Sequence, residues 1–340
     1  MKKAFVTGIT GQDGAYLSAH LLKKGYRVYG GHRRTSSQNF WRLTELGVAD
    51  HENFSLIEHD LTDLGSNIRA ISDIEPEEIY NLAGQSFVAV SFKEPTLTAQ
   101  ISAVGALQLL EAVRIINPKI RCYQASSAEM FGKVQSIPQD ENTAFYPRSP
   151  YAVAKLFGHW SAVNYRESYG MFVSSGILFN HESPLRGPEF VTRKISQAVA
   201  RIKLGRQSKM KLGNLDSKRD WGFAGEFVDG MYRMLQAQEP GTFVLATGVT
   251  TKVRDFAMDA FEAAGINLEW SGEGDAEIGR CANSGKTYVE IDATLRRPAE
   301  VDLLLGSPAK AEKILGWKPA TTVKELTRKM VTADLARESA

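Results

Sequence analysis

The feature that most constrains this chain is the alternation of short apolar segments with helical patterns over its first two-thirds. The apolar segments are rich in β-branched and aromatic residues, and the segments between them carry apolar residues at helical spacing. Strand–helix–strand units place successive strands parallel, so the pattern predicts an α/β fold of the Rossmann-like, doubly wound kind. The expected strands are KAFVTG, RVYGG, FSLIEHD, EIYNLA, RCYQASS and SSGILFN.

The alternation loosens after about residue 180, where charged and glycine-bearing segments take over. We therefore expect residues 1–180 to form a cofactor-binding domain and residues 181–340 to form mainly a smaller α/β lobe that binds the substrate. GTFVLATG at 241–248 reads as a strand that returns to the main sheet, so the boundary is not a single cut. GWKPATTVKELTRKMVTADL predicts a final docked helix.

A glycine-rich turn follows the first predicted strand. VTGITGQDGAYL carries Gly8, Gly11 and Gly14 at GxxGxxG spacing between a strand and a helix. Glycine permits a tight turn and lets a pyrophosphate approach the backbone N–H groups at the positive end of the helix. In this position the turn favours a dinucleotide site over an ordinary tight turn.

The end of the second strand distinguishes NADP from NAD. NAD sites usually carry Asp or Glu about 20 residues after the glycine turn, where it binds the ribose 2′-hydroxyl. The segment YGGHRRTSS has none, but it offers Arg33 and Arg34, followed by hydroxyl side chains that include Ser36. Guanidinium groups match a 2′-phosphate in charge and shape. We therefore expect NADP, the alternative being a solvated basic loop. Asp60 and Leu61 are expected near the adenine, and NLAGQS (81–86) near the ribose and nicotinamide.

Two further motifs carry polar side chains suited to catalysis. SPYAVAKLFGHW places Tyr151 and Lys155 on one face of a helix, and QASSAEMFG places Ser127 and Glu129 where a buried strand leaves the sheet. An ammonium group near a phenol lowers its pKa, which makes tyrosine a usable base near neutral pH. On an unrelated helix such a Tyr/Lys pair is usually a solvent-exposed pair with no catalytic role.

The order of these motifs resembles the short-chain dehydrogenase/reductase superfamily in its extended form. The resemblance implies that Ser127 hydrogen-bonds the sugar hydroxyl being oxidised while Tyr151, beside Lys155, takes its proton. A carboxylate such as Glu129, next to an oxidised C4, can remove the acidified C5 proton. Water then leaves from C6 and the stored hydride returns there, so no net cofactor is consumed. A simple 4-reductase or 4-epimerase does not need this carboxylate.

Longer blocks resemble the GDP-mannose 4,6-dehydratase family over essentially the whole chain, and two of them are specific to that family. These two are NHESP…FVTRKI and LGNLD-x-KRDWG. The resemblance implies a hydro-lyase that converts GDP-D-mannose to GDP-4-keto-6-deoxy-D-mannose. Ala128 stands where the related dTDP-glucose dehydratases use an acid, so Glu129 is also the expected proton donor to the C6 oxygen.

The resemblance and the strand-end positions together give the expected site residues. The catalytic set is Ser127, Glu129, Tyr151 and Lys155. The cofactor set is Gly8, Thr10, Gly11, Gln12, Asp13, Gly14, Arg33, Arg34, Ser36, Asp60, Leu61, Leu82, Ala83, Gln85, Ser86, Tyr151, Lys155, His181 and Arg186. The GDP-sugar set is Ser86, Glu129, Asn180, Val191, Lys194, Leu212, Gly213, Arg219, Arg297 and Glu300.

Some of these assignments have alternatives. A nucleoside diphosphate needs converging cations, and Lys218 is a further candidate that is equally well explained as a solvated neighbour. Glu300 is expected to accept from a ribose diol, and the alternative is an ion pair with an arginine. Leu97 stands where the family often has tyrosine near the cofactor, which weakens one expected contact.

Composition limits the other partners. The formal net charge is only +2, so we expect neither nucleic acid nor a membrane surface as a partner. The two cysteines, Cys122 and Cys281, belong to no Cys/His cluster, which predicts no metal site and suits a reducing cytoplasm. MKKAFVTG has no signal-peptide pattern. Phe40 and Trp41 in a polar segment favour a homo-oligomer, unless Trp41 tucks under its own domain. The family resemblance implies a tetramer rather than a dimer.

Two other functions fit part of the sequence. A GDP-mannoheptose 4,6-dehydratase would keep the mechanism and the GDP anchor and change only the sugar. A non-catalytic NADP-binding regulator is disfavoured, because such a protein has no chemical need for the complete set of four catalytic side chains.

Overall fold

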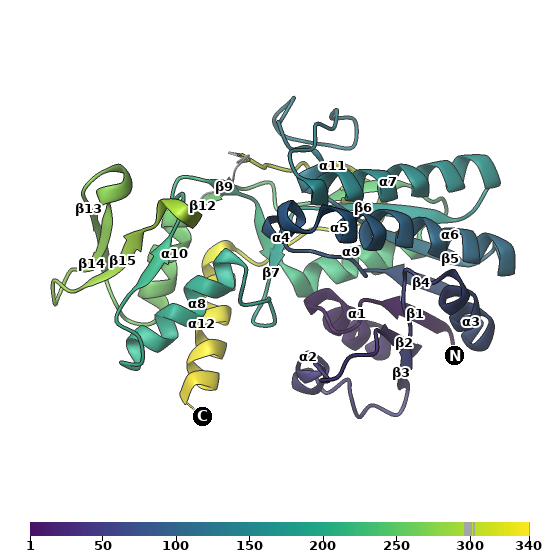
Figure 1. Cartoon of the computed structure of the whole chain (residues 1–340), viewed down its shortest axis with the longest axis horizontal. Helices are drawn as coiled ribbons and strands as arrows, with labels where there is room; N and C mark the ends of the chain where they lie inside the picture. Colours follow the sequence, from purple (N-terminus) through teal and green to yellow (C-terminus); the bar gives the residue numbers. More distant parts are fainter. Residues whose placement is uncertain (296–300, 302, 340) are drawn as a thin grey trace.

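The computed structural model describes residues 1–295, 301 and 303–339. Figure 1 shows a large sheet with helices on both faces beside a smaller lobe. The main sheet is parallel throughout and has the order β11-β6-β5-β4-β1-β2-β3. Its strands are β1 (Lys3–Thr7), β2 (Arg27–His32), β3 (Phe54–Glu58), β4 (Glu78–Asn81), β5 (Arg121–Ser127), β6 (Val173–Leu178) and β11 (Thr242–Leu245). The predicted α/β, Rossmann-like fold is confirmed.

Side chains along each central strand alternate between two apolar cores. In β1, Ala4 and Val6 belong to one core and Phe5 to the other, and in β4 the same holds for Tyr80 and Ile79. This is the period-two alternation of a strand. Because both faces are covered, the strands read in the sequence as nearly continuous apolar runs.

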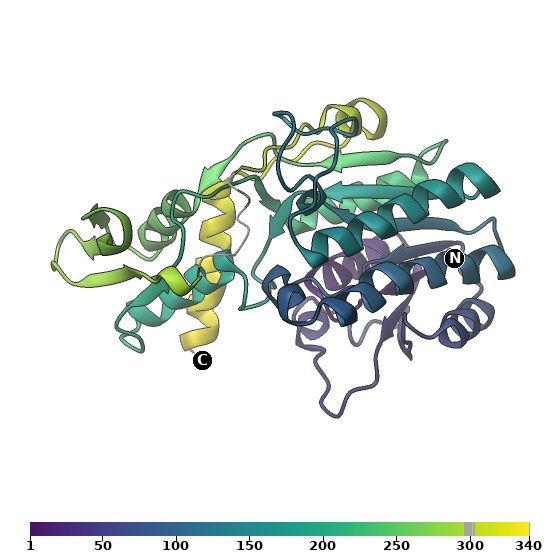
Figure 2. The same ribbon diagram turned by 45° about the horizontal axis from the view of Figure 1, so that its top comes forward.

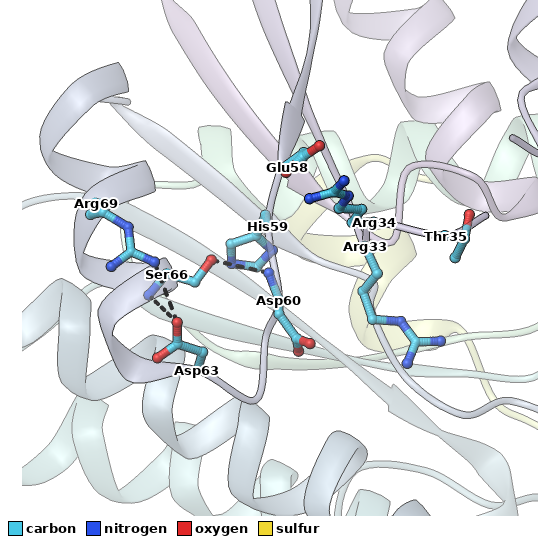
Figure 3. Close-up of a pocket in the computed structure, with 9 residues that line it drawn as sticks. All are labelled: Arg33, Arg34, Thr35, Glu58, His59, Asp60, Asp63, Ser66 and Arg69. Carbon is cyan, nitrogen blue, oxygen red and sulfur yellow. Dashed lines mark hydrogen bonds and ion pairs between the residues drawn. The ribbon is translucent and has the colours of Figure 1, made fainter. Parts of the chain in front are cut away.

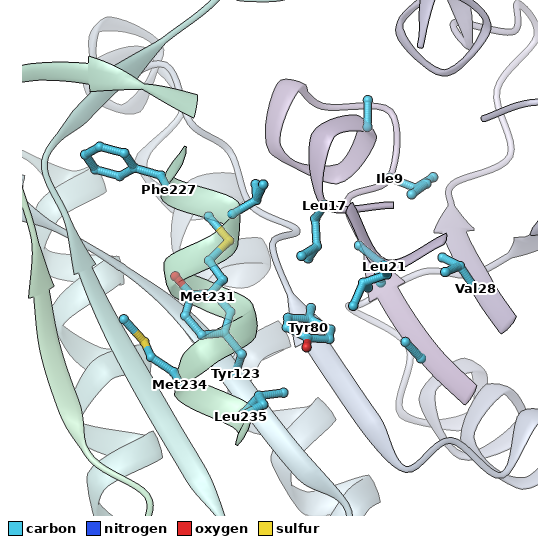
Figure 4. Packing of buried hydrophobic residues seen from close by; sticks show 14 of the residues in the cluster. Ile9, Leu17, Leu21, Val28, Tyr80, Tyr123, Phe227, Met231, Met234 and Leu235 are labelled. Carbon is cyan, nitrogen blue, oxygen red and sulfur yellow. The ribbon is translucent and has the colours of Figure 1, made fainter. Parts of the chain in front are cut away.

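One face of the sheet is covered by α1 (Gln12–Lys23), α9 (Ala224–Gln236) and α11 (Ala309–Leu315). Figure 4 shows Leu17 and Leu21 of α1 and Met231 of α9 gathered around Tyr80 and Tyr123, two rings from the sheet. Helices α9 and α11 come from beyond residue 220, so the chain returns to the main sheet after it has entered the smaller lobe.

The opposite face carries α3 (Leu64–Ile74), α6 (Gly105–Ile116) and α7 (Pro150–Tyr169), and Figure 2 shows α6 and α7 running side by side. A continuous helical run precedes α6 and consists of α5 (Pro95–Ala99) and a π-helical turn, η1 (Gln100–Val104). Two short helices, α2 (Trp41–Glu45) and α4 (Val88–Lys93), follow the ends of β2 and β4. These short elements flank the carboxyl edge of the sheet.

The run Pro95–Ile116 is, among the described residues, the one helix long and apolar enough by composition to cross a bilayer, with a mean hydropathy of 1.4. It packs on α3 and α7 as part of the helical layer, and 44% of its apolar window is buried inside the fold. Its apolar character therefore has an explanation within the packed fold.

The smaller lobe has its own apolar core, built around Trp221, Phe256 and Met330. Its helices are α8 (Val191–Lys203), α10 (Val253–Ala263) and α12 (Val323–Ser339). Its sheet has the order β13 (Leu268–Ser271), β14 (Ile278–Cys281), β15 (Thr287–Ile291) and β8 (Met210–Leu212). The predicted final helix is α12, which packs on α8 and α10.

Two short ladders lie between the lobe and the main sheet. β7 (Asn180–Glu182) pairs with β10 (Trp221–Phe223), and β9 (Lys218–Arg219) pairs with β12 (Thr251–Lys252). Single turns of 3₁₀ helix complete the described elements: η2 (Ala128–Met130), η3 (Gly274–Ala276) and η4 (Ala293–Leu295).

Candidate active site

The glycine turn between β1 and α1 lies against the segment that follows β4. Gly8 has a left-handed φ of +69°, and a Cβ added there would lie 2.8 Å from the Ala83 nitrogen. At Gly14 an added Cβ would lie 2.7 Å from the Gly8 carbonyl oxygen. Helix α1 begins after Gly11, which offers no side chain to cap the first amides. The turn therefore lets an anionic group reach the backbone N–H groups at the start of α1.

A chain of buried side chains ties together the strand ends beside this turn. Thr7 Oγ1 donates to Asn81 Oδ1 at 2.7 Å, and Asn81 Nδ2 donates to Gln124 Oε1 at 2.8 Å. The Thr7 hydroxyl also accepts from the Ala83 amide at 3.1 Å. The ends of β1, β4 and β5 are thus fixed relative to one another.

A hollow of about 360 Å³ crosses the sheet edge next to the turn. Many expected cofactor residues line it: Gly8, Thr10, Arg33, Asp60, Leu61, Ala83 and Gln85. Leu97 is there too, and it is joined by residues that the sequence did not single out, namely Gly31, His32, His59, Glu94 and Ile101. The motifs supply one side of this hollow, and the helical run after β4 supplies the other.

A second hollow, of about 580 Å³, continues outward from the first and shares Arg33 and Asp60 with it. Figure 3 shows Arg33 and Arg34 on one side of this hollow and, on the other side, Arg69 of α3 with its partner Asp63, the residue that caps α3. The Arg69 and Asp63 side chains are 3.3 Å apart. Sequence reasoning missed the α3 residues, since only the tertiary fold brings them opposite the end of β2.

Asp60 is engaged within its own turn. Its Oδ1 atom accepts from the Thr62 amide at 2.9 Å and from the Thr62 hydroxyl at 2.8 Å. Burial raises the pKa of Asp60, but these hydrogen bonds and the nearby Arg33 outweigh burial and lower it. One of the two arginines expected at a 2′-phosphate, Arg33, therefore acts on this carboxylate.

The second side of the site comes from β7. His181 Nε2 lies 2.8 Å from Asp13 Oδ2, while its Nδ1 lies 2.8 Å from the Phe179 carbonyl oxygen. Gln12 Nε2 donates to the His181 carbonyl at 3.1 Å, and Ser183 Oγ donates to Gln12 Oε1 at 2.7 Å. The side chains of Gln12 and Asp13 are thus used to hold β7, which leaves their backbone amides to face the turn.

The charges of this pair depend on each other. Burial raises the pKa of Asp13, but His181 and Gln12 outweigh burial and lower it to about 2. Burial lowers the pKa of His181, but the Asp13 carboxylate outweighs it, so the pKa is raised above its usual 6.5. The structure therefore favours an ion pair over two neutral groups.

The four expected catalytic residues come from β5, η2 and the first turns of α7. Ser149 caps α7 by accepting from the Ala152 amide at 3.1 Å, which fixes the start of the helix. Ser127 ends β5, and its hydroxyl oxygen accepts from the Glu129 amide at 3.2 Å. That hydroxyl also acts on Tyr151, where it stabilises the phenolate and so opposes the rise in pKa that burial causes.

Lys155 lies on the same face of α7, and its ammonium group hydrogen-bonds the backbone of β5. Its Nζ atom donates to the Ala125 carbonyl oxygen at 3.0 Å and is 5.9 Å from the centre of the Tyr151 ring. An added Cβ at Gly84 would be 3.7 Å from this Nζ, so Lys155 adjoins the end of the first hollow. Tyr151 and Lys155 are both 8% exposed.

The expectation that the ammonium group lowers the pKa of the phenol is wrong for this arrangement. Burial raises the pKa of Tyr151 to about 12, the Ser127 hydrogen bond opposes burial, and Glu129 adds to it. Burial also lowers the pKa of Lys155 to about 8, with Asp13 opposing. Burial is thus the main influence on both pKa values, although the two side chains are close along the helix.

Most of the expected GDP-sugar residues belong to segments after residue 179, whereas Ser86, which follows β4, and Glu129, in η2, belong to the larger domain. Lys194 on α8 is half-buried, and burial lowers its pKa while Asp292 opposes. Arg219 is buried at the end of β9, and an added Cβ at Gly213 would lie 3.2 Å from the Leu295 carbonyl oxygen. Arg297 and Glu300 lie outside the described residues. The remaining members are Asn180 on β7, Val191 at the start of α8 and Leu212 on β8.

More than half of the expected cofactor residues line neither hollow. These are Gly11, Gln12, Asp13, Gly14, Ser36, Leu82, Ser86, Tyr151, Lys155, His181 and Arg186. Arg186 is outside them because its Nε atom is 3.0 Å from Glu182 Oε2 and its guanidinium lies on the Phe190 ring. The part of the chain that the structure describes contains no group of three or more His, Cys, Asp or Glu side chains arranged to hold a metal.

Comparisons with known proteins agree with this geometry. The family model for GDP-mannose 4,6 dehydratase matches residues 5–330. The GDP-mannose 4,6-dehydratase of Sinorhizobium fredii is 52% identical, over 98% of this chain and 97% of that protein. The human GDP-mannose 4,6 dehydratase is 49% identical, over 98% of this chain and 91% of that protein.

Solved structures show the same fold. RMD from Pseudomonas aeruginosa, complexed with NADPH, has a TM-score of 0.77 and 25% identity over 99% of this chain and all of that one. The dTDP-glucose 4,6-dehydratase from Bacillus anthracis, in complex with NAD, has a TM-score of 0.81 and 18% identity over 100% of this chain and 98% of that one.

Proposed function

The chain belongs to the GDP-mannose 4,6 dehydratase family, and on that premise we propose how its own residues carry out the reaction. It is an NADP-dependent nucleotide-sugar 4,6-dehydratase that converts GDP-D-mannose to GDP-4-keto-6-deoxy-D-mannose and water. The observation that carries the proposal is that the Ser127 hydroxyl accepts from the Glu129 amide at 3.2 Å, and that Ser127 and Glu129 both act on the buried Tyr151 phenol.

The residues around the two hollows fit NADP. The turn would hold the pyrophosphate, since Gly8 and Gly14 have no room for a Cβ and the first amides of α1 face the turn. Arg33 and Arg34 would hold the 2′-phosphate, and Arg33 lines both hollows. NADP, when bound, supplies a reversible hydride acceptor next to the sugar.

Tyr151 is proposed as the base that takes the proton from the C4 hydroxyl. The Ser127 hydroxyl is proposed to donate to the phenol oxygen, and it stabilises the phenolate against the effect of burial. Lys155, through its bond to the Ala125 carbonyl, ties α7 to β5 and keeps a cationic group near the phenol. Together these residues orient and deprotonate the hydroxyl.

Glu129 is proposed as the acid–base residue for the dehydration itself. Its amide is bonded to Ser127, and its charge acts on Tyr151, so the carboxylate lies close to the same point as the phenol. Once C4 is a ketone, the C5 proton is acidic enough for a carboxylate to remove. The proton that Glu129 takes can then be given to the C6 oxygen as water leaves.

The GDP group is proposed to lie against the smaller lobe. Arg219, Lys194 and the backbone at Gly213 come from three separate segments of the chain, and the two cationic side chains suit a diphosphate. This proposal makes residues 181–340 mainly the substrate-binding part, and residues 1–180, with β11, mainly the NADP-binding part.

We also propose a homo-oligomer, with a tetramer favoured over a dimer, in the cytoplasm. Apolar side chains on α7 recur at helical spacing and remain exposed, namely Val153, Phe157 and Trp160. A stripe of this kind is typical of a helix face that packs against a partner. Trp41 is 38% exposed and lies over the Arg42 guanidinium, so it supports assembly less than α7 does.

One experiment tests the reaction and the sugar together. The purified protein is incubated with GDP-mannose, without added NADPH, and the product is followed by NMR. A 4-keto-6-deoxy product, with deuterium placed at C4 recovered in the C6 methyl group, is expected. GDP-mannoheptose is run in parallel, and a higher kcat/KM with that sugar would overturn the assignment of mannose as the preferred substrate.

A further inference from the structure

Helix α7 presents polar side chains at one-turn spacing to the end of β5, and two of them belong to the proposed catalytic set. Tyr151 meets the hydroxyl of Ser127. One turn later, Lys155 Nζ donates to the Ala125 carbonyl oxygen at 3.0 Å. Both contacts tie the helix to the last residues of the strand.

A third contact lies one turn further along the same face. His159 Nδ1 is 2.9 Å from Ser126 Oγ. The two residues are 3% and 5% exposed, so the hydrogen bond is shielded from water. The His159 ring packs edge-on against Phe145, with 5.4 Å between ring centres, and against Trp160, with 5.7 Å. The ring therefore has one position, which the Ser126 bond and its aromatic neighbours define together.

The position of Ser126 next to Ser127 determines how this hydrogen bond can affect the catalytic site. Ser126 belongs to the alternate side chains of β5 that face α7, and Ser127 is the next residue and the last of the strand. Holding Ser126 against α7 therefore fixes the rotation of the strand end. That rotation decides where the Ser127 hydroxyl lies relative to Tyr151.

The contact is not a charge switch. Burial, with a smaller contribution from Arg166, lowers the pKa of His159 to about 4. The ring is therefore neutral at neutral pH, and its bond to the serine joins two neutral groups. The bond can therefore affect catalysis only by positioning the end of β5.

We propose that His159 is a positioning residue for the dehydratase, which holds Ser126 so that the next residue, Ser127, meets Tyr151. This inference rests on the catalytic roles proposed above for Ser127 and Tyr151. His159 touches neither the substrate nor the cofactor in this proposal, and it acts only through the strand end.

The test uses variants that separate the hydrogen bond from the bulk of the ring. His159→Phe keeps an aromatic ring and removes the bond, Ser126→Ala removes the other partner, and His159→Asn keeps a polar atom at the position of Nδ1. We expect kcat to fall about 10-fold in the first two variants, with KM for GDP-mannose within about twofold of wild type. His159→Asn should recover most of the lost kcat.

The pH profile supplies a readout that stability alone would not move. Burial, Glu129 and Asp13 raise the pKa of Tyr151, whereas the Ser127 hydroxyl and Arg186 lower it. If the strand end shifts, the Ser127 bond weakens and the pKa of Tyr151 rises. The rise of kcat with pH should therefore move to higher pH in His159→Phe and Ser126→Ala, and return in His159→Asn.

Tyr165→Phe is the matched control on the same helix. Tyr165 is 8% exposed and its hydroxyl donates to Glu111 Oε2 at 2.7 Å, away from the site. Its loss should lower the melting temperature and leave kcat and the pH profile unchanged. If His159→Phe behaves in the same way, or if folded His159→Asn shows no recovery, the proposal is overturned.

The catalytic assignment is checked separately. Ser127→Ala and Tyr151→Phe should abolish turnover while NADP stays bound, as read from its absorbance after purification. If either variant stays active, the proposed catalytic roles fail. If both are inactive and His159→Phe has wild-type kinetics, only the positioning role fails. Should His159→Phe not fold, Ser126→Ala and His159→Asn decide the matter by the same measurements.

Discussion

Asp13 and His181 are 168 residues apart in the sequence, yet the carboxylate Oδ2 of the first lies 2.8 Å from the Nε2 of the second. The pair joins the first turn of α1 to β7. In the proposed site, the cofactor turn and the first segment of the substrate lobe are held together by this ion pair and by the hydrogen bonds of Gln12. The two halves of the site therefore have a linked dependence on pH.

The first prediction concerns that pH dependence. The pKa of Asp13 is lowered to about 2, so its stabilising effect is complete above its usual 3.8 and is lost as the pH falls through about 2. The pKa of His181 is raised, so its effect is complete below its usual 6.5 and is lost as the pH rises through the raised value. The pair is thus strongest in the window between these two reference values.

Asp13→Asn should therefore cost most near pH 5.5, by roughly 2 kcal/mol in the free energy of unfolding. The difference from wild type should shrink at pH 8.5 and at pH 3. Urea unfolding at fixed NADP concentration measures it. Asp73→Asn, at an exposed position on α3, is the control and should show a small difference that does not vary with pH. A penalty for Asp13→Asn that is constant with pH would contradict the ion pair.

The strands of the main sheet could be read from the sequence because the local pattern and the fold agree. Ala4 and Val6 face one core and Phe5 the other, so the whole segment is apolar and its strand character is plain. The glycine turn could be read for a similar reason, because Gly8 needs a left-handed φ and Gly14 has no room for a side chain. Such local requirements produce residue patterns at fixed spacing, which can be recognised in the sequence.

The rest of the site depends on contacts that leave no local mark. Nothing near Gln12 and Asp13 indicates that their side chains bind a segment some 170 residues away, as the structure shows. The same is true of Arg69, which reaches the outer hollow only because α3 lies opposite the end of β2. The raised pKa of Tyr151 has no local mark either, because its main cause, the depth of burial, is a property of the packed fold.

The second prediction tests NADP selection at Arg33, which lines both hollows. Arg33→Met removes the charge and keeps most of the stem. We expect the Kd for NADP to rise about 10-fold or more, because a charged hydrogen bond contributes about 1.5–3 kcal/mol, while the Kd for NAD changes little. Fluorescence titration of both dinucleotides measures this. Arg206→Met, at an exposed arginine of the smaller lobe, should change neither value. An equal loss for NAD and NADP would place the 2′-phosphate elsewhere.

The third prediction separates Glu129 from the rest of the catalytic set. Glu129→Gln keeps the shape of the side chain and removes the base. In D₂O, exchange at C5 of the sugar should slow by about 100-fold or more, because general acid–base groups contribute about 10² to 10⁴ to such steps. NADP should remain bound. NMR of the recovered nucleotide sugar measures the exchange, and Glu262→Gln, an exposed change on α10, is the control. Exchange at the wild-type rate would remove Glu129 from the mechanism.

The last prediction concerns the exposed stripe on α7. Phe157 is 47% and Trp160 55% exposed, on a helix whose other face is packed against the sheet. If a second copy covers this stripe, Phe157→Glu combined with Trp160→Glu introduces charges that would be buried without partners. Light scattering coupled to gel filtration should then show a smaller particle than wild type. Ile314→Glu, on α11, is a matched control because Ile314 is 56% exposed on the opposite side of the sheet, and it should leave the size unchanged. If the α7 variant keeps the wild-type mass, the subunits meet through another surface, and the segment around Trp41 becomes the next to test.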